Sequence, residues 1–387
     1  MALKVCIVTG TRAEWGLLRL PAQHIKQATG LELQIVATAA HLVDELGHTV
    51  DDIEKDGFTV DARIPTLEPG DDVFAITRSL GRGVIGFAQA FEDLQPDIVM
   101  VLGDRYEMLG VVQAALLARI PVAHLCGGDI TEGAFDESIR HAITKMSHIH
   151  FVTNRDAEKR VRQMGEDPRH IHLVGSPGID AILQQPRLPK AELFADLGLT
   201  PREKTMTVTF HPPTLDERSA QEQMQILLDA LQDLEDDVAI ILTGSNADID
   251  GLSLTRMAEQ FAKEHDNAAF RISLGQQNYY SALAISDVAV GNSSSGLYEA
   301  PSFNIPTVNI GDRQKGRLRA TSTIDCETDR EEIVAAINKA LEMDCTGTVN
   351  PYGDGEASPR IVTVLQAIKM PRSLITKHFF DLDTREF

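Results

Sequence analysis

The sequence has 387 residues, of which 43% are hydrophobic and 24% are charged, a composition typical of a globular protein with room for about two domains. Its formal net charge of −21, with no basic block, argues against a nucleic-acid partner, because a phosphate backbone would be repelled over most of the surface. No apolar run approaches the roughly 20 residues that span a bilayer, and no signal-peptide pattern opens the chain, so we expect a cytoplasmic protein with no membrane partner.

Short β-branched runs alternate with longer helical patterns through the first half of the chain. They are continuously apolar rather than alternating, which favours parallel strands that are covered on both faces. The runs lie at residues 4–10, 33–40, 97–104, 121–128, 148–153 and 170–176. This pattern predicts a doubly wound α/β domain over residues 1–185.

The alternation of strand-like runs and helical patterns starts again after residues 186–203, which are polar and proline-bearing. Further strand-like runs lie at residues 205–212, 238–244, 270–275, 287–294 and 307–312. They predict a second Rossmann-like domain over residues 200–365, followed by a C-terminal segment, 366–387, that can pack back on the first domain. Thr328 and Glu331 have the spacing of a capping box at the start of a late helix. Because loops at the carboxyl ends of parallel strands converge, a ligand is expected in the crevice between the two domains.

Two loops have the small residues and hydroxyls that suit phosphate groups. After the first strand, "GTRAE" leads into a helix whose first backbone amides can meet an anion, although it lacks the G-x-G-x-x-G spacing of a dinucleotide site. Arg12 in this loop could clamp a phosphate or be an ordinary surface charge. "GNSSSGLYE" offers Ser293, Ser294 and Gly296 at the start of another helix, where backbone N–H groups can approach a phosphate closely.

Three further polar residues lie near strand ends in the second half. Glu299, about a turn beyond the serines, could accept hydrogen bonds from ribose hydroxyls or simply face the solvent. His211 in "FHPPT" could be a turn histidine, and Arg313 in "GDRQKGR" could be a surface charge. Together they surround the predicted crevice.

Carboxylates gather after two strands of the first half. Asp104 and Arg105 follow one strand directly, where they could form an ion pair with each other. The loop after the next strand adds Asp129, Glu132 and Asp136, although Asp136 could also be the N-cap of the helix that follows. Carboxylates in one cleft raise one another's pKa values, which prepares one for proton donation and another for proton abstraction.

The histidines and cysteines do not predict a metal site. The histidines at positions 124, 141, 148 and 150 are spread over a strand end and a helix, with no tetrahedral set. The cysteines at positions 6, 126, 326 and 345 are scattered, so we expect reduced thiols. Arg140, in the same helix as His141, is expected to anchor a substrate or a carboxylate.

Seven motifs in order carry a resemblance that covers nearly the whole chain. They are "GTRAE", "GDRYE", "GGDITEGAFDESIRHAITKMSHIHF", "FHPPT", "GNSSSG", "GDRQKGR" and "YGDGEASPRI". The sequence resembles the hydrolysing UDP-N-acetylglucosamine 2-epimerase family, which includes the epimerase part of the sialic-acid biosynthetic enzymes. The related non-hydrolysing epimerases read GTRPE and have a proline-arginine pair after the histidine of "HP", whereas this chain has Ala13 and Pro213 at the differing positions.

The resemblance implies the two-domain glycosyltransferase-B fold, with the active site in the interdomain cleft, no cofactor, and a homodimer or homotetramer. The substrate would be a nucleotide sugar, with the nucleotide held mostly by the second domain and the sugar facing the first. The residues that would serve the diphosphate and nearby groups are Arg12, His211, Ser293, Ser294 and Arg313. Glu299 would hold the ribose, and Arg105 and Arg140 are further substrate-binding candidates. Asp104 and Asp136 match family carboxylates at the sugar.

One loop departs from the commonest family pattern. Where many relatives read HIEGG, this chain has Cys126 in place of the glutamate, and one extra residue precedes Asp136. Cys126 is therefore expected to line the sugar pocket, and Asp129 and Glu132 are candidates to replace the missing acid. The variant resembles the branch that acts on N,N'-diacetylbacillosamine nucleotides in legionaminic-acid pathways, so that substrate and UDP-N-acetylglucosamine both stay open.

The implied reaction explains the acidic loop. A carboxylate removes the C2 proton while UDP leaves from C1, and water then adds to the 2-acetamidoglycal to give the free 2-epimeric sugar. Two faces of one carbon need two proton-handling groups, for which Asp104 and Asp136 are the candidates. A glycosyltransferase of the same fold would instead transfer the sugar to an acceptor, and a nucleotide-sugar sensor would bind without turnover. The gathered carboxylates favour the epimerase.

Overall fold

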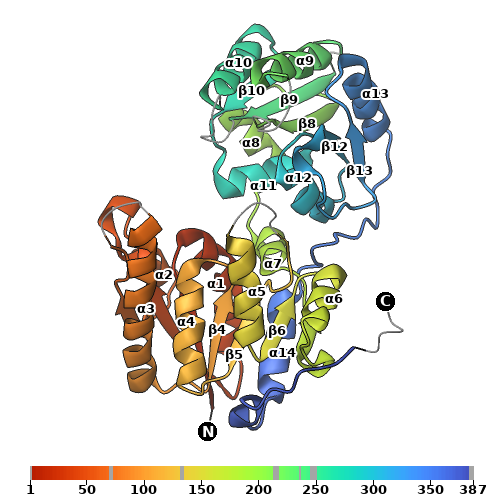
Figure 1. Cartoon of the computed structure of the whole chain (residues 1–387). Helices are drawn as coiled ribbons and strands as arrows, with labels where there is room; N and C mark the ends of the chain where they lie inside the picture. The colour runs from red at the N-terminus through yellow and green to blue at the C-terminus, as the bar shows by residue number, and fades with distance from the viewer. Residues whose placement is uncertain are drawn as a thin grey trace. The chain divides into compact units, whose positions relative to one another are not determined.

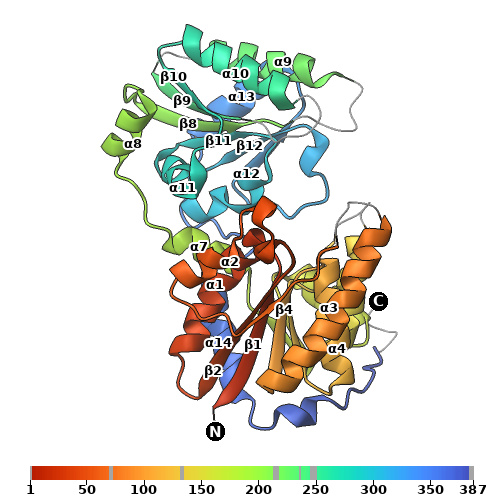
Figure 2. The same ribbon diagram turned by 90° about the vertical axis from the view of Figure 1, so that its left-hand side faces the viewer.

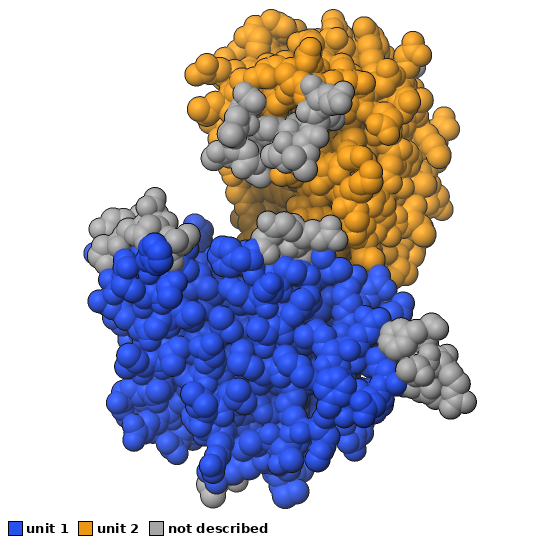
Figure 3. Space-filling model, in the orientation of Figure 1, with its two compact units in different colours: residues 1–181, 353–387 blue, residues 182–352 orange. Residues whose placement is uncertain are grey.

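The computed structural model describes residues 2–68, 73–130, 135–211, 218–234, 237–244 and 251–382. The chain divides into two compact units (Figure 3), of which unit 1 comprises Met1–Ala181 and Gly353–Phe387, and unit 2 comprises Ile182–Tyr352. The expected boundary at residue 365 is therefore wrong. Helix α14 (Ala357–Ala367) belongs to unit 1, because its apolar residues join the core cluster that contains helix α1 (Arg12–Gln27).

Unit 1 is built on a seven-stranded sheet in which every neighbouring pair of strands is parallel. Its strands are β1 (Leu3–Thr9), β2 (Leu31–Thr38), β3 (Ala62–Ile64), β4 (Ile98–Leu102), β5 (Val122–Leu125), β6 (Ile149–Val152) and β7 (Ile171–Leu173). The spatial order is β3-β2-β1-β4-β5-β6-β7. Sequence reasoning missed β3, because this edge strand has only three residues and one of them is Arg63.

Helices cover both faces of this sheet (Figure 2). The core on one face takes apolar residues from α1, α2 (Val50–Lys55) and α14, and the core on the other face takes them from α3 (Val73–Leu94), α4 (Tyr106–Leu117) and α5 (Asp136–Met146). Helix α6 (Arg155–Gln163) packs on β6 and β7, and α7 (Pro177–Gln184) carries the chain from unit 1 into unit 2. Burial on two faces explains why the strands are continuously apolar.

Unit 2 repeats the design with a parallel sheet of six strands in the order β10-β9-β8-β11-β12-β13. The strands are β8 (Lys204–Thr209), β9 (Val238–Thr243), β10 (Ala268–Arg271), β11 (Val288–Gly291), β12 (Thr307–Ile310) and β13 (Thr323–Cys326). One face packs on α9 (Ala220–Gln232), α10 (Gly251–Glu264) and α13 (Arg330–Leu341), and the other on α8 (Lys190–Leu197) and α11 (Gly275–Ile285). A short helix, α12 (Ser294–Tyr298), follows β11 (Figure 1).

Both sheets therefore have the strand order of a doubly wound Rossmann-like domain, as predicted. In each, the order reverses beside the first strand of the unit, between β1 and β4 in unit 1 and between β8 and β11 in unit 2. Ligands of such folds bind at the carboxyl ends of the strands next to this reversal. The fold thus directs attention to the loops that follow β1, β4, β8 and β11.

The start of α13 differs from the prediction. Asp329 is the N-cap, and its side chain accepts hydrogen bonds from the backbone N–H groups of Glu331 and Glu332. Thr328 instead donates its hydroxyl to the Gln223 side chain at 3.4 Å. Aspartate is a stronger N-cap than threonine, so the helix begins one residue later than the predicted capping box would place it.

The C-terminal segment returns to unit 1. Gln366 donates to the Thr29 carbonyl at 3.0 Å, and the Phe380 N–H donates to the Gly165 carbonyl at 2.9 Å. Lys377 donates to the carbonyls of Lys145 and Ser147, at the end of α5. These contacts satisfy carbonyl groups at the C-terminal end of α5, the helix that begins at Asp136.

Within the described ranges, no helix combines the length and the apolar character needed to cross a membrane.

Candidate active site

The carboxyl ends of β4 and β5 in unit 1 carry a buried ion-pair cluster around Arg140. The Arg140 guanidinium donates to the Asp104 carboxylate, to the Asp129 carbonyl at 2.8 Å and to the Glu137 carboxylate at 3.1 Å. Only 6% of the Arg140 side chain is exposed, so a guanidinium in this place needs these acceptors. The arrangement holds Asp104 as an anion beside the end of β4. The role expected for Arg140 as an anchor of a carboxylate matches this geometry.

Asp104 and Arg105 do not pair with each other. Arg105 donates instead to Glu107 at 2.7 Å. Both carboxylates near Arg105, those of Glu107 and Glu14, are buried, and each has one oxygen with no partner in the part of the chain that the structure describes. The simple ion-pair alternative for neighbouring residues 104 and 105 is therefore wrong, because their side chains leave the turn toward different partners.

Glu14 is a residue that sequence reasoning missed. Its carboxylate accepts from the N–H groups of Gly10 at 2.6 Å and Thr11 at 3.1 Å, and Thr11 in turn caps the Glu14 N–H at 3.2 Å. Burial and, to a smaller extent, nearby Glu107 raise the pKa of Glu14 to about 7, although the hydrogen bonds from Gly10 and Thr11 act to lower it. The threonine-to-glutamate spacing in "GTRAE" was the available signal, since it is that of a capping box.

This capping box reduces the number of backbone N–H groups available to an anion at the start of α1, where an anion site was expected. It occupies two amides of the loop, and the N–H groups at the first two helical positions, Arg12 and Ala13, remain for a ligand. The Arg12 side chain is 81% exposed, and the nearest carboxylate oxygen, on Asp52, is 3.9 Å away. Arg12 is thus accessible to an anion, and its present ion pair is weak.

Asp136 is the first residue of α5 and not its N-cap. Phe135 occupies the N-cap position and makes no side-chain cap, so the alternative role for Asp136 is wrong. The half-buried Asp136 carboxylate accepts no hydrogen bond from a described residue, unlike neighbouring Glu137, which pairs with Arg140 and with His141 at 2.9 Å. Asp136 is therefore available to a ligand.

Asp129 has a different environment from the other two acids. Its carboxylate accepts from the Thr153 hydroxyl at 3.0 Å and from the Asn154 amide at 3.0 Å, which ties the loop after β5 to the turn after β6. Burial raises the pKa of Asp129, and the same hydrogen bonds oppose that shift. The geometry supports a role in holding the loop. Glu132, the other candidate for the missing acid, lies outside the described residues.

Cys126 has an uncommon backbone conformation, with φ of 62°. Few residues other than glycine adopt positive φ, so the loop after β5 is held in a specific turn. Burial raises the pKa of the Cys126 thiol above its ordinary value, and Asp129 adds to that effect. A thiol is a poor nucleophile or base when its pKa is raised, and Cys126 packs against the core of unit 1.

The histidines near this loop have structural partners. His124 is fully buried between the Gly103 carbonyl at 2.7 Å and the Thr144 hydroxyl at 3.2 Å, and burial lowers its pKa to about 3. It is a neutral imidazole that joins the ends of β4 and α5. Across the described ranges, no group of three or more histidine, cysteine, aspartate or glutamate side chains is arranged to hold a metal ion.

Unit 2 has a cavity of about 710 Å³ at the carboxyl ends of its strands. It is lined by residues of several loops, among them His211, Ser293, Ser294, Glu299 and Arg313. The site residues predicted from this half of the chain are thus brought together in one place. Most of the lining groups that can form hydrogen bonds are hydroxyls, amides and cations, which suits an anionic ligand.

Asn292 is the second residue that sequence reasoning missed. Its side chain accepts from the His211 N–H at 2.7 Å and donates to the His211 carbonyl at 2.9 Å. Its own carbonyl accepts from Arg313 at 3.3 Å and from Gln314 at 2.8 Å. Asn292 therefore fixes two loops that both line the cavity. The close packing requires Gly291 before it, because a Cβ there would lie 2.0 Å from the Thr209 carbonyl oxygen.

The serine loop differs in one respect from the prediction. Ser293 is the N-cap of α12, and its hydroxyl accepts from the Ser295 N–H at 3.3 Å. Helix α12 has only five residues, so its dipole is smaller than that of the longer helix expected there. The Ser294 hydroxyl has no hydrogen bond to a described residue and lines the cavity. It is the serine best placed to donate to a ligand.

Glu299 lines the same cavity and is held from behind. The Ser295 hydroxyl donates to its carboxylate at 2.5 Å, and the Tyr279 hydroxyl donates to Ser295 at 2.6 Å. Burial raises the pKa of Glu299, and the hydrogen bond from Ser295 opposes that shift. The alternative of a glutamate that merely faces the solvent is wrong, because this residue is half-buried and its carboxylate is hydrogen-bonded.

Comparison with known proteins assigns the chain to a family. The family model described as UDP-N-acetylglucosamine 2-epimerase matches residues 23–366. The chain belongs to this epimerase family. The resemblance carried by the seven motifs is thereby confirmed, and the membership identifies the chain as a relative of nucleotide-sugar epimerases.

Individual relatives of the epimerase family cover most of the chain. It is 42% identical, over 84% of its length and 84% of the relative's, to the GDP/UDP-N,N'-diacetylbacillosamine 2-epimerase (hydrolyzing) of Campylobacter jejuni. It is 34% identical, over 97% of its length and 99% of the relative's, to the UDP-N,N'-diacetylbacillosamine 2-epimerase (hydrolyzing) of Legionella pneumophila. The crystal structure of UDP-GlcNAc 2-epimerase from Neisseria meningitidis bound to UDP-GlcNAc has a TM-score of 0.80 at 17% identity, covering 95% of this chain and 100% of that one, and so shares the fold.

Proposed function

We propose that this epimerase hydrolyses a UDP-linked 2-acetamido sugar and releases UDP and the free 2-epimer. The observation that supports it most is the pair of acids in unit 1. Asp104 is held as an anion by buried Arg140, and Asp136 begins the helix that carries Arg140 and has no partner among the described residues. An elimination followed by an addition needs two such groups.

The proposed reaction has two steps. In the first, one carboxylate accepts the C2 proton, the electron pair of the C2–H bond forms the C1–C2 double bond, and UDP leaves C1 with the electron pair of the C1–O bond. In the second, the electron pair of the C1–C2 double bond takes a proton from an acid on the opposite face of C2, a water oxygen bonds to C1, and the proton that this water loses passes to a carboxylate of the pair. Asp104 and Asp136 handle these protons as a coupled pair, so each step belongs to the pair rather than to one residue.

Unit 2 supplies the nucleotide site in this proposal. Arg313, His211 and the Ser294 hydroxyl face the diphosphate, and Glu299 accepts hydrogen bonds from the ribose. The cavity that these residues line and the fixed position of the loops around Asn292 support the assignment. Arg12 of unit 1, whose side chain is 81% exposed, is a further candidate for binding an anionic group.

We propose a UDP-N,N'-diacetylbacillosamine substrate ahead of UDP-N-acetylglucosamine. Two hydrolysing relatives that are 42% and 34% identical carry the first substrate in their names, whereas the UDP-N-acetylglucosamine 2-epimerase of Neisseria meningitidis is 28% identical. Cys126 supports the same choice, because it replaces a charged glutamate in a pocket wall that would meet a 4-acetamido group and a 6-methyl group in place of hydroxyls.

The test is product analysis by NMR in D₂O, with each of the two UDP-sugars and no acceptor. The expected result is UDP and the free 2-epimer in equal amounts, with solvent deuterium at C2 and the higher kcat/KM for the diacetylbacillosamine nucleotide. A product without deuterium at C2 would exclude the elimination. Sugar release that requires an added acceptor would instead indicate a glycosyltransferase.

Two further features of the enzyme stay predictions. A cytoplasmic location fits the four cysteines, which are all free thiols in the structure. A homodimer or homotetramer is the expectation from the family resemblance, and light scattering coupled to size-exclusion chromatography measures it.

A further inference from the structure

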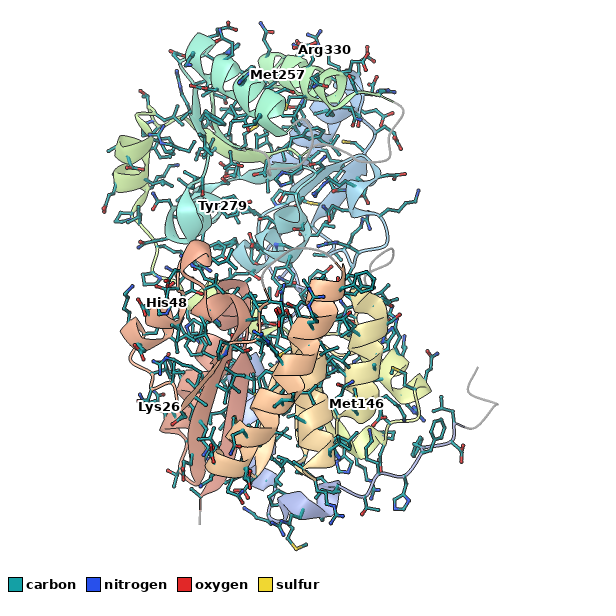
Figure 4. The ribbon with its side chains drawn as sticks, turned by 60° about the vertical axis from the view of Figure 1, so that its left-hand side comes forward. Lys26, His48, Met146, Met257, Tyr279 and Arg330 are labelled. Atoms are coloured by element: carbon teal, nitrogen blue, oxygen red, sulfur yellow. The ribbon has the colours of Figure 1, made fainter. Side chains whose placement is uncertain are left out.

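A chain of hydroxyl groups lies behind Glu299 in unit 2. The Thr209 and Thr243 hydroxyls, at the ends of β8 and β9, are 2.7 Å apart, and Thr209 also hydrogen-bonds to Tyr279. Tyr279, which Figure 4 labels on α11, donates to Ser295 at 2.6 Å, and Ser295 donates to Glu299 Oε2 at 2.5 Å. This series of hydroxyl groups therefore connects two strand ends and two helices to one oxygen of the Glu299 carboxylate.

The hydrogen-bond directions in this chain are determined by the number of protons. A serine hydroxyl has one proton and an acceptor side. Because Tyr279 donates to the acceptor side of Ser295, the serine proton is left for the carboxylate. One oxygen of Glu299 is thus occupied and the plane of the carboxylate is fixed. Removal of the Tyr279 hydroxyl would free Ser295 to rotate, so that its proton could leave Glu299.

The second oxygen of Glu299 is the one presented to the cavity. Oε1 accepts no hydrogen bond from a described residue, and Glu299 is one of the residues that line the cavity. A half-buried carboxylate oxygen is stabilised by donors, and hydrogen bonds to a charged acceptor are stronger than those between neutral groups. The vicinal hydroxyls of a ribose offer two donors at suitable spacing.

We propose that Tyr279 and Ser295 are positioning residues that orient the Glu299 carboxylate for the ribose diol and so make the site discriminate ribonucleotides from 2′-deoxyribonucleotides. The inference rests on the proposed function, in which Glu299 holds the ribose, and it adds which residues give that contact its selectivity. Tyr279 touches neither the sugar nor the diphosphate in this scheme.

The experiment measures the Kd of UDP and of 2′-deoxy-UDP by calorimetry for the full-length protein. For the wild type we expect UDP to bind about 10-fold more tightly or more, the scale of one lost hydrogen bond to a charged group. In Tyr279→Phe and in Ser295→Ala this ratio should fall to about threefold or less, chiefly because UDP binds more weakly. Circular dichroism confirms that each variant folds.

Tyr280→Phe is the matched control. Tyr280 is the next residue of α11, is buried, and also lines the cavity, but its hydroxyl lies 3.5 Å from the Gln276 amide and is outside the hydroxyl chain. This variant should keep the wild-type ratio of the two Kd values. If Tyr279 acted only through packing, Tyr279→Phe would keep the wild-type ratio as well, since the phenylalanine ring preserves the packing.

The outcomes separate this inference from the proposed function. If the wild type binds UDP but Tyr279→Phe keeps the wild-type ratio, or weakens UDP and 2′-deoxy-UDP equally, the positioning role is wrong and the nucleotide site stands. If the wild type binds neither nucleotide, the proposed function falls and this inference falls with it. A ratio that collapses in both hydroxyl variants and persists in Tyr280→Phe supports the proposal.

Discussion

The loops at the carboxyl ends of the strands differ chemically between the two units, although the strand order is the same. In unit 1, the loop after β4 carries Asp104, helix α5 carries Asp136 and Arg140, and the acids near Arg140 are partly enclosed. In unit 2, the corresponding loops carry mainly hydroxyls, amides and isolated cations, and Glu299 is the one carboxylate lining the cavity among the described residues.

The difference teaches how one scaffold serves two tasks. Proton transfer needs ionisable groups whose charge is controlled by burial and by close partners, and the Arg140 cluster provides such an environment. Binding an anionic nucleotide to a protein of net charge −21 needs donors without nearby negative charge. We therefore expect substitutions in unit 1 to affect turnover or acid stability, and substitutions in the unit 2 cavity to affect nucleotide affinity.

The largest expected effect follows from Asp136→Asn and Asp104→Asn. Each should lower turnover by about 10² or more while the Kd of UDP stays within about twofold, since a positioned acid or base contributes on this scale. Only Asp104→Asn should also lower Tm, because it removes the anion that pairs with buried Arg140. A parallel loss of UDP affinity in Asp136→Asn would place that residue at the nucleotide instead.

The next effect concerns the unit 2 cavity. Glu299→Ala should weaken UDP binding by about 10-fold, and Ser294→Ala by a smaller factor, with turnover at saturating substrate nearly unchanged, because the lost contacts exist before and during the reaction. Steady-state kinetics with Kd measurement distinguishes KM from kcat. A large fall in kcat for Glu299→Ala would mean that the division of tasks between the units is wrong.

The third effect is an acid sensitivity of unit 1. Burial lowers the pKa of His124 to about 3 and that of His148 to about 4, and the Nδ1 atom of His148 accepts from the Val122 N–H at 3.1 Å. The folded state therefore favours neutral imidazoles. The contribution of these histidines to the free energy of unfolding is complete above pH 6.5, roughly their pKa in the unfolded chain. It is lost as the pH falls toward 4, by up to about 1.4 kcal/mol per pH unit for each histidine.

Trp15 is the only tryptophan of the chain and lies in the core of unit 1, so urea unfolding followed by its fluorescence reports on that unit. His148→Gln should flatten the slope of stability against pH between 6.5 and 4, and exposed His378→Gln should leave it unchanged. Glu14 has the opposite effect on this slope, because a group with a raised pKa in the folded state loses stabilising free energy as the pH rises, here from about 4.5 to 7. Glu14→Gln should therefore make the slope steeper. Equal slopes in all variants would contradict the assignment.

The smallest effect is expected for Cys126→Ser. The raised pKa of the thiol leaves it protonated at neutral pH, so serine should keep turnover within about threefold of the wild type. The side-by-side measurement with Asp104→Asn uses the same assay and the same substrate. A loss as large as that of Asp104→Asn would show that the thiol has replaced the family's glutamate in proton transfer.

Local patterns in the sequence were enough to predict most of the fold and many of the candidate site residues. Continuous apolar runs predicted parallel strands because burial on two faces leaves no polar positions, and β3 was missed because three residues carry too little of that pattern. The loops that follow these runs named His211, Ser294, Glu299 and Asp104 without any tertiary information, since strand ends of this fold gather at one edge.

Only the tertiary structure decided which groups meet. Asp104 pairs with Arg140, 36 residues away, rather than with adjacent Arg105, and Asn292 binds His211 across 81 residues. Such pairings depend on which side chains are desolvated together, because an ion pair or hydrogen bond becomes strong only where water is excluded. The same reason places α14 in unit 1, where its apolar face is covered by α1. Periodicity in the sequence predicts that a helix or strand has an apolar face that must be buried. Only tertiary packing decides which other element buries it.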